Sequence, residues 1–282
     1  MLTGQMPETG WFFGRRGKHA IDRYTRMLPG SLDGPSPFAD VAQKFVICCT
    51  SRTGSTLLCR LLQSYGAESQ EFLNPQRVEI EKALSGARNY RELCAHLVRA
   101  YAPGKAFGLK GTFQVVAPLF LISEFPDNLD GWRFVFLTRA NLVRQAISMI
   151  LAQKQQAYAS WQEPIRAIGD EDYVAEEIAG AIEIITLGNA WWESFFANFG
   201  VEPLRITYEQ LAADQGGTAE TVSRFCGLTQ SGGHADGEPR GRPLSRQSTE
   251  LNLRWEARFR AEMRSLRVAT FATKEEQTIS ME

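Results

Sequence analysis

The sequence predicts an α/β protein whose mostly parallel central sheet is covered by helices on both faces. Short apolar runs typical of buried strands alternate with longer helical patterns along the 282-residue chain. The first such run breaks directly into a small, hydroxyl-rich turn that opens an apolar helix. We find neither a repeat nor an internal linker, so we expect one domain over residues 41–282. A partly irregular arm rich in Gly, Pro and charge is expected over residues 1–40.

In the first half of the chain, a strand over 44–49 leads into the turn. The helix that follows extends to about Tyr65, because Gly66 is a typical helix terminator. The segment from Lys105 to Lys110 is predicted as the next strand. Helical patterns are predicted over 77–85, 89–101 and 112–123.

The second half continues this alternation. An apolar strand over 132–138 is followed by Asn141, which can cap a helix with one apolar face. A long helical pattern extends from Asp172 to Phe199, and we expect a break in it at Gly188. The remaining elements are a looser stretch over 156–171, a short strand over 203–208, a helix over 218–226 and a mostly solvated arginine-rich segment over 240–267.

Composition argues against several classes of protein. A net charge of −1 and a pI near 6.4 disfavour bulk attraction to nucleic acid. The five cysteines form no CxxC or Cys/His spacing, so we expect reduced thiols used for packing, and no metal site. No apolar stretch approaches the roughly 20 residues of a membrane span, and the first residues lack the apolar core of a secretion signal. We therefore expect no transmembrane segment and a cytoplasmic location.

The turn after the first strand has the features of an anion-binding site. A helix that starts directly after a strand offers unpaired backbone N–H groups and the positive end of its dipole to a ligand in the turn. Gly54 allows a close approach of the backbone, and Arg52 supplies a fixed cation. Hydroxyl donors are added by Ser51, Thr53, Ser55 and Thr56.

This turn resembles a Walker A phosphate loop but lacks the Gly-Lys-Ser/Thr ending, because Gly54 is followed by Ser55 and Thr56. A nucleoside triphosphate also needs Mg²⁺, which an acidic residue at a neighbouring strand end usually holds. The strand over 132–138 ends near Arg139 without a carboxylate. The site is therefore expected to take a metal-free anion of lower charge. The turn resembles the 5′-phosphosulfate loop of sulfotransferases, which use 3′-phosphoadenosine 5′-phosphosulfate (PAPS) as donor.

Further candidate residues follow other strands. Parallel strands place their carboxyl ends at one edge of the sheet, so the turn and Arg139 should lie close together. Arg139 can hold a phosphate with two N–H groups, and Ser148, nine residues later, can add a hydroxyl; the alternative is a solvent-facing arginine and a helix-surface serine. Lys110 ends a strand at the same edge, either as an active-site cation or as a strand-end charge. Trp191 and Trp192 are expected in the core.

Several short motifs together carry a resemblance to a known family. They are Thr50–Leu58, Gln70-Glu71-Phe72, Gly108-Leu109-Lys110, Arg139 with Gln145–Ser148, and Arg246-Gln247 followed by Trp255. Over about residues 44 to 265 the chain resembles the bacterial trehalose 2-sulfotransferase family and the related rhizobial Nod-factor and lipopolysaccharide sulfotransferases. The resemblance implies a P-loop-like three-layer sandwich of the sulfotransferase fold, PAPS as donor, and homodimers.

The same resemblance implies roles for individual residues. Arg139 and Ser148 would bind the 3′-phosphate, and Arg246 would lie near the cofactor. Glu71 falls where the family's proposed carboxylate base lies, with Glu68 as the nearby competitor. Residues expected to bind the 5′-phosphosulfate are Thr50, Ser51, Arg52, Thr53, Gly54, Ser55 and Thr56. The three histidines lie outside these motifs: His19, His96 and His234.

We therefore predict a PAPS-dependent sulfotransferase that acts on a hydroxyl of a carbohydrate or glycolipid. A base such as Glu71 is needed because the acceptor hydroxyl loses its proton as the S–O bond forms. A P-loop small-molecule kinase and a catalytically silent nucleotide-binding protein are the alternatives. The acceptor cannot be identified from the sequence, but contacts to it are expected from 73–104 and 151–171.

Overall fold

The computed structural model describes residues 22, 26, 36–102, 106–121, 129, 131–158, 162–229 and 250–279; for residues 121 and 266–279 it describes the backbone alone. Most of the predicted arm over 1–40, and Arg246, therefore lie outside the described residues. The chain divides into two compact units, which we describe separately. Unit 1 comprises Met1–Ala140 and Thr186–Gly241, and unit 2 comprises Asn141–Ile185 and Arg242–Glu282.

The centre of unit 1 is a five-stranded sheet with the strand order β2-β3-β1-β4-β5. Every neighbouring pair of these strands is parallel, which confirms the predicted fold class. Because all five strands point the same way, their carboxyl ends share one edge. The strands are β1 (Gln43–Cys49), β2 (Glu68–Gln70), β3 (Ala106–Gly111), β4 (Trp132–Thr138) and β5 (Leu204–Thr207).

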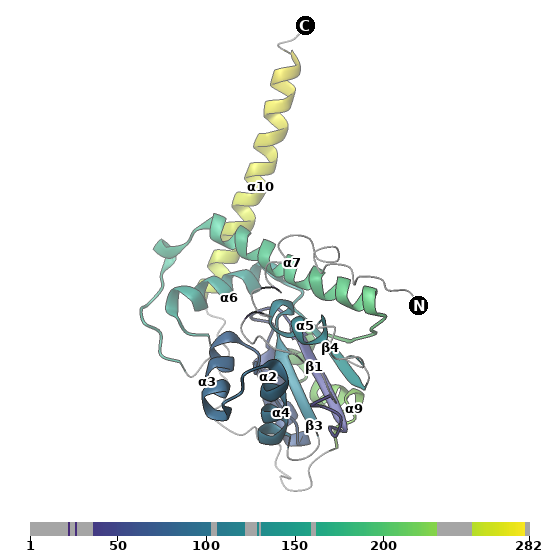
Figure 1. The fold of residues 1–282 in the computed structure, drawn as a ribbon. Coiled ribbons are helices and arrows are strands. Elements are labelled where there is room, and N and C mark those ends of the chain that lie inside the picture. The colour runs from purple at the N-terminus through teal and green to yellow at the C-terminus, as the bar shows by residue number, and fades with distance from the viewer. Residues whose placement is uncertain are drawn as a thin grey trace. The chain divides into compact units, whose positions relative to one another are not determined.

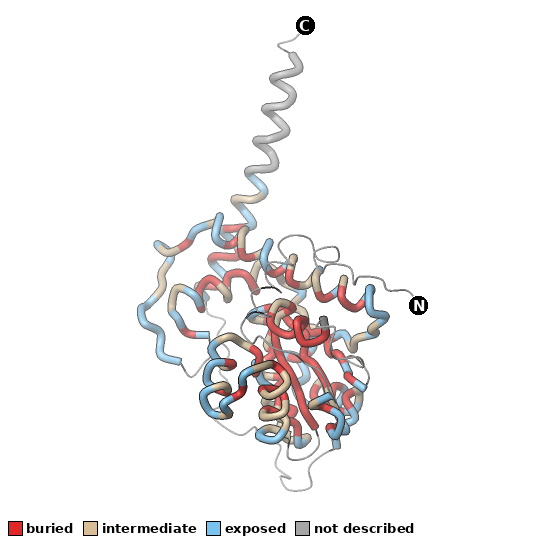
Figure 2. Tube along the Cα trace, in the orientation of Figure 1, coloured by how far each residue is buried: buried red, intermediate tan, exposed pale blue. Residues whose placement is uncertain are grey.

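Side chains of β1 alternate between two cores, one on each face of the sheet. Val46 and Cys48 belong to an aromatic-rich core. Phe45, Ile47 and Cys49 belong to a second, mostly aliphatic core on the opposite face. Burial on both faces is typical of a parallel strand under helices, and Figure 2 shows the strands as a buried layer. All five cysteines are free and buried, as predicted.

The helices of unit 1 cover both faces (Figure 1). The aromatic core takes residues from α3, α4, α5 and the second half of α7, and the aliphatic core takes residues from α2, α8 and α9. Trp192 of α7 is fully buried, and its ring lies 5.3 Å edge-on from that of Phe113. The helices are α2 (Ser55–Leu62), α3 (Pro75–Ser85), α4 (Tyr90–Tyr101), α5 (Phe113–Leu121), α7 (Ala175–Phe199), α8 (Tyr208–Ala213) and α9 (Gln215–Phe225).

Two sequence predictions need correction, and one strand was not predicted. The polar segment Glu68–Gln70 is a strand, β2, because it pairs with β3 at the sheet edge. The helix α7 continues through Gly188 without a break, since the surrounding core holds it. Tyr208 begins the helix α8 instead of ending a strand, because Thr207 caps that helix: its Oγ1 accepts from the backbone N–H of Gln210 at 3.2 Å.

Unit 2 packs α6 (Leu142–Gln155), the first part of α7 and the start of α10 (Glu250–Ile279) around a small apolar core. Trp255 of α10 is buried there, with its ring 5.6 Å edge-on from that of Tyr173. This unit also contains a short 3-10 helix, Asp170–Asp172, before α7.

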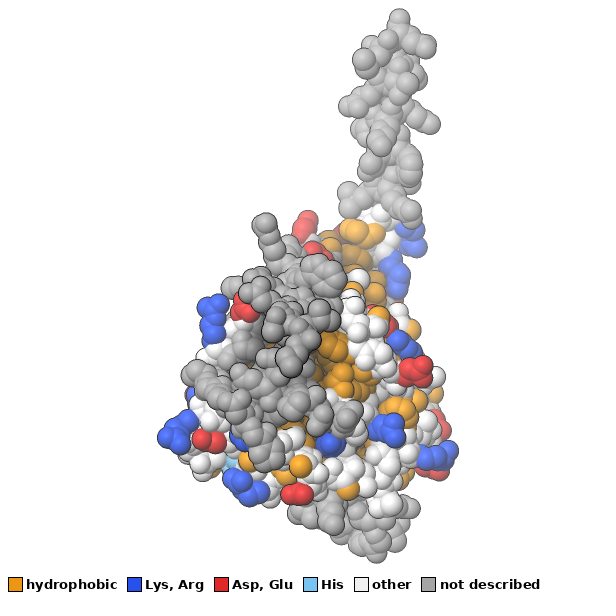
Figure 3. Space-filling view, turned by 45° about the vertical axis from the view of Figure 1, so that its right-hand side comes forward, with side chains coloured by type: hydrophobic (Ala, Val, Ile, Leu, Met, Phe, Trp, Pro, Cys, Tyr) orange, Lys and Arg blue, Asp and Glu red, His pale blue; other side chains and the backbone are white. Residues whose placement is uncertain are grey.

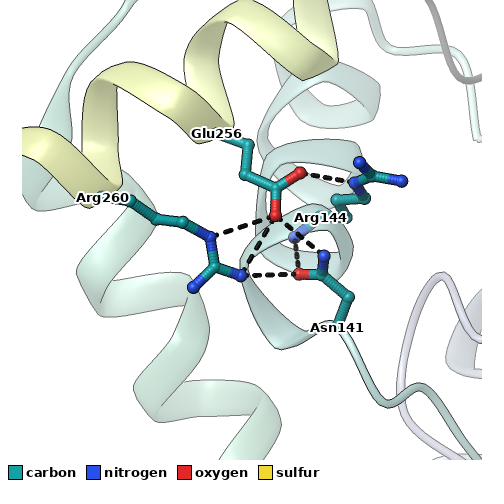
Figure 4. Close-up of polar contacts among 4 residues, drawn as sticks. All are labelled: Asn141, Arg144, Glu256 and Arg260. Carbon is teal, nitrogen blue, oxygen red and sulfur yellow. Dashed lines mark hydrogen bonds and ion pairs between the residues drawn. The ribbon is translucent and has the colours of Figure 1, made fainter.

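A buried carboxylate fastens α10 to the start of α6 (Figure 4). Glu256 is 8% exposed and its Oε1 accepts from Asn141 Nδ2 at 2.8 Å and from Arg260 Nη2 at 3.0 Å. Its Oε2 accepts from Arg144 Nε. Asn141 also caps α6, as predicted, by accepting the backbone N–H of Arg144. Arg260 thus pairs with a buried acid, while its own side chain and those of Arg254 and Arg258 stay about half exposed, as the sequence predicted for most of this segment.

Glu256→Gln is expected to lower the free energy of unfolding by about 1–3 kcal/mol, because hydrogen bonds to a charged group are lost. Burial raises the pKa of Glu256, but its hydrogen bonds to Asn141, Arg144 and Arg260 outweigh burial and hold the pKa below its usual value. A depressed pKa adds stability that is fully present above the unfolded-state value and is lost as pH falls through the folded-state value.

Urea denaturation of wild type and Glu256→Gln at several pH values tests this expectation. The stability difference should shrink as the pH falls below 4.5. Glu163→Gln, at an exposed acid of the same unit, serves as the control and should change little at any pH. A difference that stays constant down to low pH would contradict an ionised Glu256 as the stabilising group.

Candidate active site

Each of the five strands of unit 1 ends near a residue or loop that could bind a ligand or take part in a reaction. The turn 50–54 follows β1, Glu71 follows β2, and Lys110 lies next to the last residue of β3. Arg139 follows β4, and Tyr208 follows β5. Because the strands are parallel, these residues gather at one edge of the sheet. The sequence analysis expected the turn and Arg139 at one edge, and the structure confirms this placement.

The backbone of the turn is held in an uncommon conformation. Gly54 has φ +82° and serves as the N-cap of α2 without a side-chain cap. A Cβ at Gly54 would lie 2.8 Å from Cδ2 of Tyr208, so the ring of Tyr208 packs directly on this glycine. Arg52 also has a positive φ, 68°, which is costly for a residue with a side chain. Such strain is common where a loop is shaped for a ligand.

Several hydroxyl groups of the turn hold the loop itself. Thr53 is fully buried, and its Oγ1 donates to the carbonyl of Thr50 at 3.1 Å. Thr50 Oγ1 donates to Asn189 Oδ1 of α7 at 3.4 Å. Ser55, the first residue of α2, is also buried. The sequence predicted that the hydroxyls of Thr53 and Ser55 face the anion. The hydroxyl of Thr53 instead braces the turn from inside, and the role of Ser55 stays a prediction.

Two arginines meet at the turn. Arg139 Nη1 donates to the carbonyl of Arg52 at 3.4 Å, and its guanidinium lies 4.5 Å from the ring centroid of Tyr208. Burial first, and then the charge of Arg139, lower the pKa of Arg52, while Tyr208 raises it. An anion bound between the two guanidinium groups would offset their repulsion, so the electrostatics favour a negatively charged ligand.

A lysine links the turn to a candidate base. Lys110 is only 8% exposed; its Nζ lies 2.9 Å from Glu71 Oε1 and donates to Thr56 Oγ1 at 3.3 Å. Burial lowers the pKa of Lys110, but Cys59 and Glu71 raise it, and the net shift is upward. Lys110 is therefore a charged ammonium at the sheet edge and not a solvated strand-end charge. Glu71 itself is about half exposed and open to a substrate hydroxyl.

The competing carboxylate has a different environment. Glu68 begins β2, whereas Glu71 follows the strand's carboxyl end. At about 3.3 Å per residue, the two backbone positions are about 10 Å apart along the strand direction. Glu68 accepts from Gln63 Nε2 at 3.3 Å and from Gln70 Nε2 at 2.5 Å. Of the two acids, Glu71 is the one in contact with Lys110.

Other predicted residues lie elsewhere. Ser148 is on α6 in unit 2, and Arg246 lies outside the described residues, so their roles stay predictions. His96 bonds to the buried Glu81 at 2.8 Å, between α4 and α3. On the face drawn in Figure 3, basic and acidic side chains are interspersed over the described residues.

Two residues at the turn were missed by the sequence analysis. Tyr208 could have been found, since it is the last residue of a predicted strand whose carboxyl end must reach the same edge. Asn189 carries no such signal, because it is one polar residue in a long apolar helix. Within the described part of the chain, no group of three or more His, Cys, Asp or Glu could hold a metal ion. No helix described here is long and apolar enough to cross a membrane.

Part of the chain matches the model of a known protein family. The model of the Stf0 sulphotransferase family matches residues 124–262, which include Arg139, Ser148 and Tyr208. Over residues 124–262 the chain matches the Stf0 sulphotransferase family. This confirms the family resemblance expected from the motifs. The match does not include the turn 50–54, Glu71 or Lys110, so the case for those residues rests on the geometry described above.

The chain was also compared with solved structures and curated proteins. The chain is similar to a sulfotransferase from Alicyclobacillus acidocaldarius, at 16% identity and a TM-score of 0.44, covering 71% of this chain and 87% of that one. It is also similar to the sulfotransferase STF1 from Mycobacterium tuberculosis H37Rv, at 15% identity and a TM-score of 0.39, covering 77% of this chain and 74% of that one. No curated protein matches the sequence. The fold assignment therefore rests on the parallel sheet itself.

Proposed function

We propose that this protein transfers a sulfuryl group from PAPS to a hydroxyl of a carbohydrate or glycolipid. The observation that carries the proposal is the continuous contact from Glu71 through Lys110 to Thr56. It joins a half-exposed carboxylate, suited to take a proton, to a turn suited to bind an anion. The match of residues 124–262 to the Stf0 sulphotransferase family model supports sulfuryl transfer as the reaction class.

Different residues act on the donor and on the acceptor during an in-line displacement. Backbone N–H groups at the start of α2 and the guanidinium of Arg52 bind the phosphosulfate and stabilise charge on the leaving phosphate. As the acceptor oxygen forms its bond to sulfur and the bond from sulfur to the phosphate oxygen breaks, the hydroxyl proton passes to Glu71. The products are the sulfated acceptor and adenosine 3′,5′-bisphosphate. None of these steps needs a metal ion.

Lys110 holds Glu71 toward the site in this scheme. Its ion pair with Glu71 and its hydrogen bond to Thr56 link the proposed base to the turn that would bind the donor. Arg139 reaches the turn from β4 and can bind phosphate with both of its terminal N–H groups. We assign to it the 3′-phosphate.

The reaction can be tested directly. The purified protein is incubated with isotope-labelled PAPS and a glycolipid and carbohydrate extract, and sulfated products are identified by mass spectrometry. Labelled sulfated product formed without Mg²⁺ is the expected result. Mg²⁺-dependent consumption of ATP would instead identify a kinase. Binding of adenosine 3′,5′-bisphosphate with no turnover of any acceptor would identify a silent nucleotide-binding protein.

Arg139→Ala is expected to weaken binding of adenosine 3′,5′-bisphosphate by roughly 1.5–3 kcal/mol, the range for a hydrogen bond to a charged group. Binding of AMP, which lacks the 3′-phosphate, should change little, and titration calorimetry with both ligands measures the difference. Arg133→Ala is the matched control, because Arg133 is an exposed arginine near the other end of the same strand. Equal weakening of both ligands by Arg139→Ala would argue that Arg139 binds the 5′-phosphate instead.

A further inference from the structure

Helix α7 touches the start of the phosphate-binding turn at three points. Gly188 lies against Thr50, since a Cβ at position 188 would be only 2.8 Å from Thr50 Cγ2. The next residue, Asn189, accepts a hydrogen bond from Thr50 Oγ1 at 3.4 Å. One turn further on, Trp192 Nε1 donates to the carbonyl of Cys49, the last residue of β1, at 3.4 Å. Gly188, Asn189 and Trp192 thus form one face of α7, which packs against the junction between β1 and the turn.

The glycine at this position is informative because glycine is unfavourable inside a helix. It costs roughly 1 kcal/mol relative to alanine, yet α7 runs through Gly188 without a break. Gly180 of the same helix offers a contrast, because a Cβ there would meet nothing within 4 Å. Of these two glycines, Gly188 alone has a steric reason to lack a side chain: Thr50 is buried and occupies that space.

We propose that Gly188 and Asn189 are positioning residues that fix Thr50, and through it the phosphosulfate-binding turn. Gly188 lets α7 approach the turn, and Asn189 sets the rotamer of Thr50 through its hydroxyl. The inference rests on the proposed function in that the turn is taken to bind PAPS. A displaced turn would misplace the N–H donors at the start of α2, and preorganised donors lose their effect when they are misplaced.

Gly188→Ala tests the proposal, with Gly180→Ala as the matched control on the same helix. Overpacking typically costs 1–3 kcal/mol, so Gly188→Ala should raise the Kd for adenosine 3′,5′-bisphosphate by about 5- to 150-fold. Gly180→Ala should leave this Kd within about twofold and raise the melting temperature, since alanine favours the helix. Calorimetry and thermal unfolding measure the two quantities.

A second readout does not depend on any ligand. Hydrogen exchange of a peptide covering residues 49–62 should become faster in Gly188→Ala and stay unchanged in Gly180→Ala. If wild type fails to bind adenosine 3′,5′-bisphosphate, the proposed function is contradicted, while this exchange comparison still decides the positioning role. If Gly188→Ala matches Gly180→Ala in both ligand binding and exchange, Gly188 does not position the turn.

A compensating substitution identifies the contact responsible. Thr50→Ser added to Gly188→Ala removes the methyl carbon that the new Cβ would meet and keeps the hydroxyl bonded to Asn189, so most of the lost affinity should return. A loss that the second substitution does not recover would overturn the Thr50 contact as its cause. If Gly188→Ala alone does not fold, the double variant decides: folded protein that binds the ligand supports the proposal, and unfolded protein overturns it.

Discussion

Replacing Glu71 with Gln is expected to lower kcat by about 10²–10⁴-fold, the usual contribution of a general base. Glutamine keeps the shape of the side chain and can still contact Lys110, but it cannot take the proton of the acceptor hydroxyl. Affinity for adenosine 3′,5′-bisphosphate should stay nearly unchanged, because the base acts on the acceptor. Steady-state kinetics with labelled PAPS, together with calorimetry, separate the two effects.

Glu68→Gln is the matched control for this experiment. Glu68 bonds to two glutamines and begins β2, whereas Glu71 follows the strand and pairs with Lys110. Glu68→Gln should therefore keep a turnover close to that of wild type. If Glu68→Gln is the inactive variant and Glu71→Gln turns over normally, the base is Glu68 and the contact between Glu71 and Lys110 is only an ion pair.

Arg52→Ala is expected to cost about 2–4 kcal/mol of transition-state stabilisation, roughly a 30- to 1,000-fold loss in kcat/KM. The reason is that Arg52 is the cation carried by the turn itself and develops its strongest contact as charge builds on the leaving phosphate. Folding should survive, because the side chain is not part of either core. Kinetic constants and circular dichroism of the variant test both statements.

Arg52→Gly gives a sharper version of this test. The positive φ of 68° at position 52 strains a residue with a side chain but suits glycine. Arg52→Gly should therefore be at least as stable as Arg52→Ala while losing as much activity. Wild-type kcat/KM in Arg52→Gly would remove Arg52 from the mechanism.

Much of the fold and part of the site follow from local sequence patterns. Apolar runs separated by helical patterns indicated a parallel sheet, and five of the six β1 residues from Lys44 to Cys49 are buried apolar side chains. The turn after Cys49 indicated an anion site because small residues and a glycine between a strand and a helix leave backbone N–H groups open. Since parallel strands end at one edge, Arg139 could be placed near this turn.

Other features depend on partners far away in the chain. The polar segment Glu68–Gln70 becomes a strand only because β3 supplies its hydrogen bonds. Glu71 and Lys110 are 39 positions apart in the sequence, and their contact exists only once β2 and β3 are paired. Local secondary-structure propensity carries no information about such pairs. It depends on a residue and its neighbours in the sequence, and not on distant residues that folding brings into contact.

By itself, the sequence determined the α/β class and predicted where an anion-binding turn with its cation Arg52 would lie. The tertiary structure alone decided which hydroxyls brace the turn and which residues hold it in place. Gly188 shows the physical reason. In isolation a mid-helix glycine predicts a break, because its backbone has more freedom to lose. Inside the protein, packing against Thr50 makes the absence of a side chain at that position an advantage.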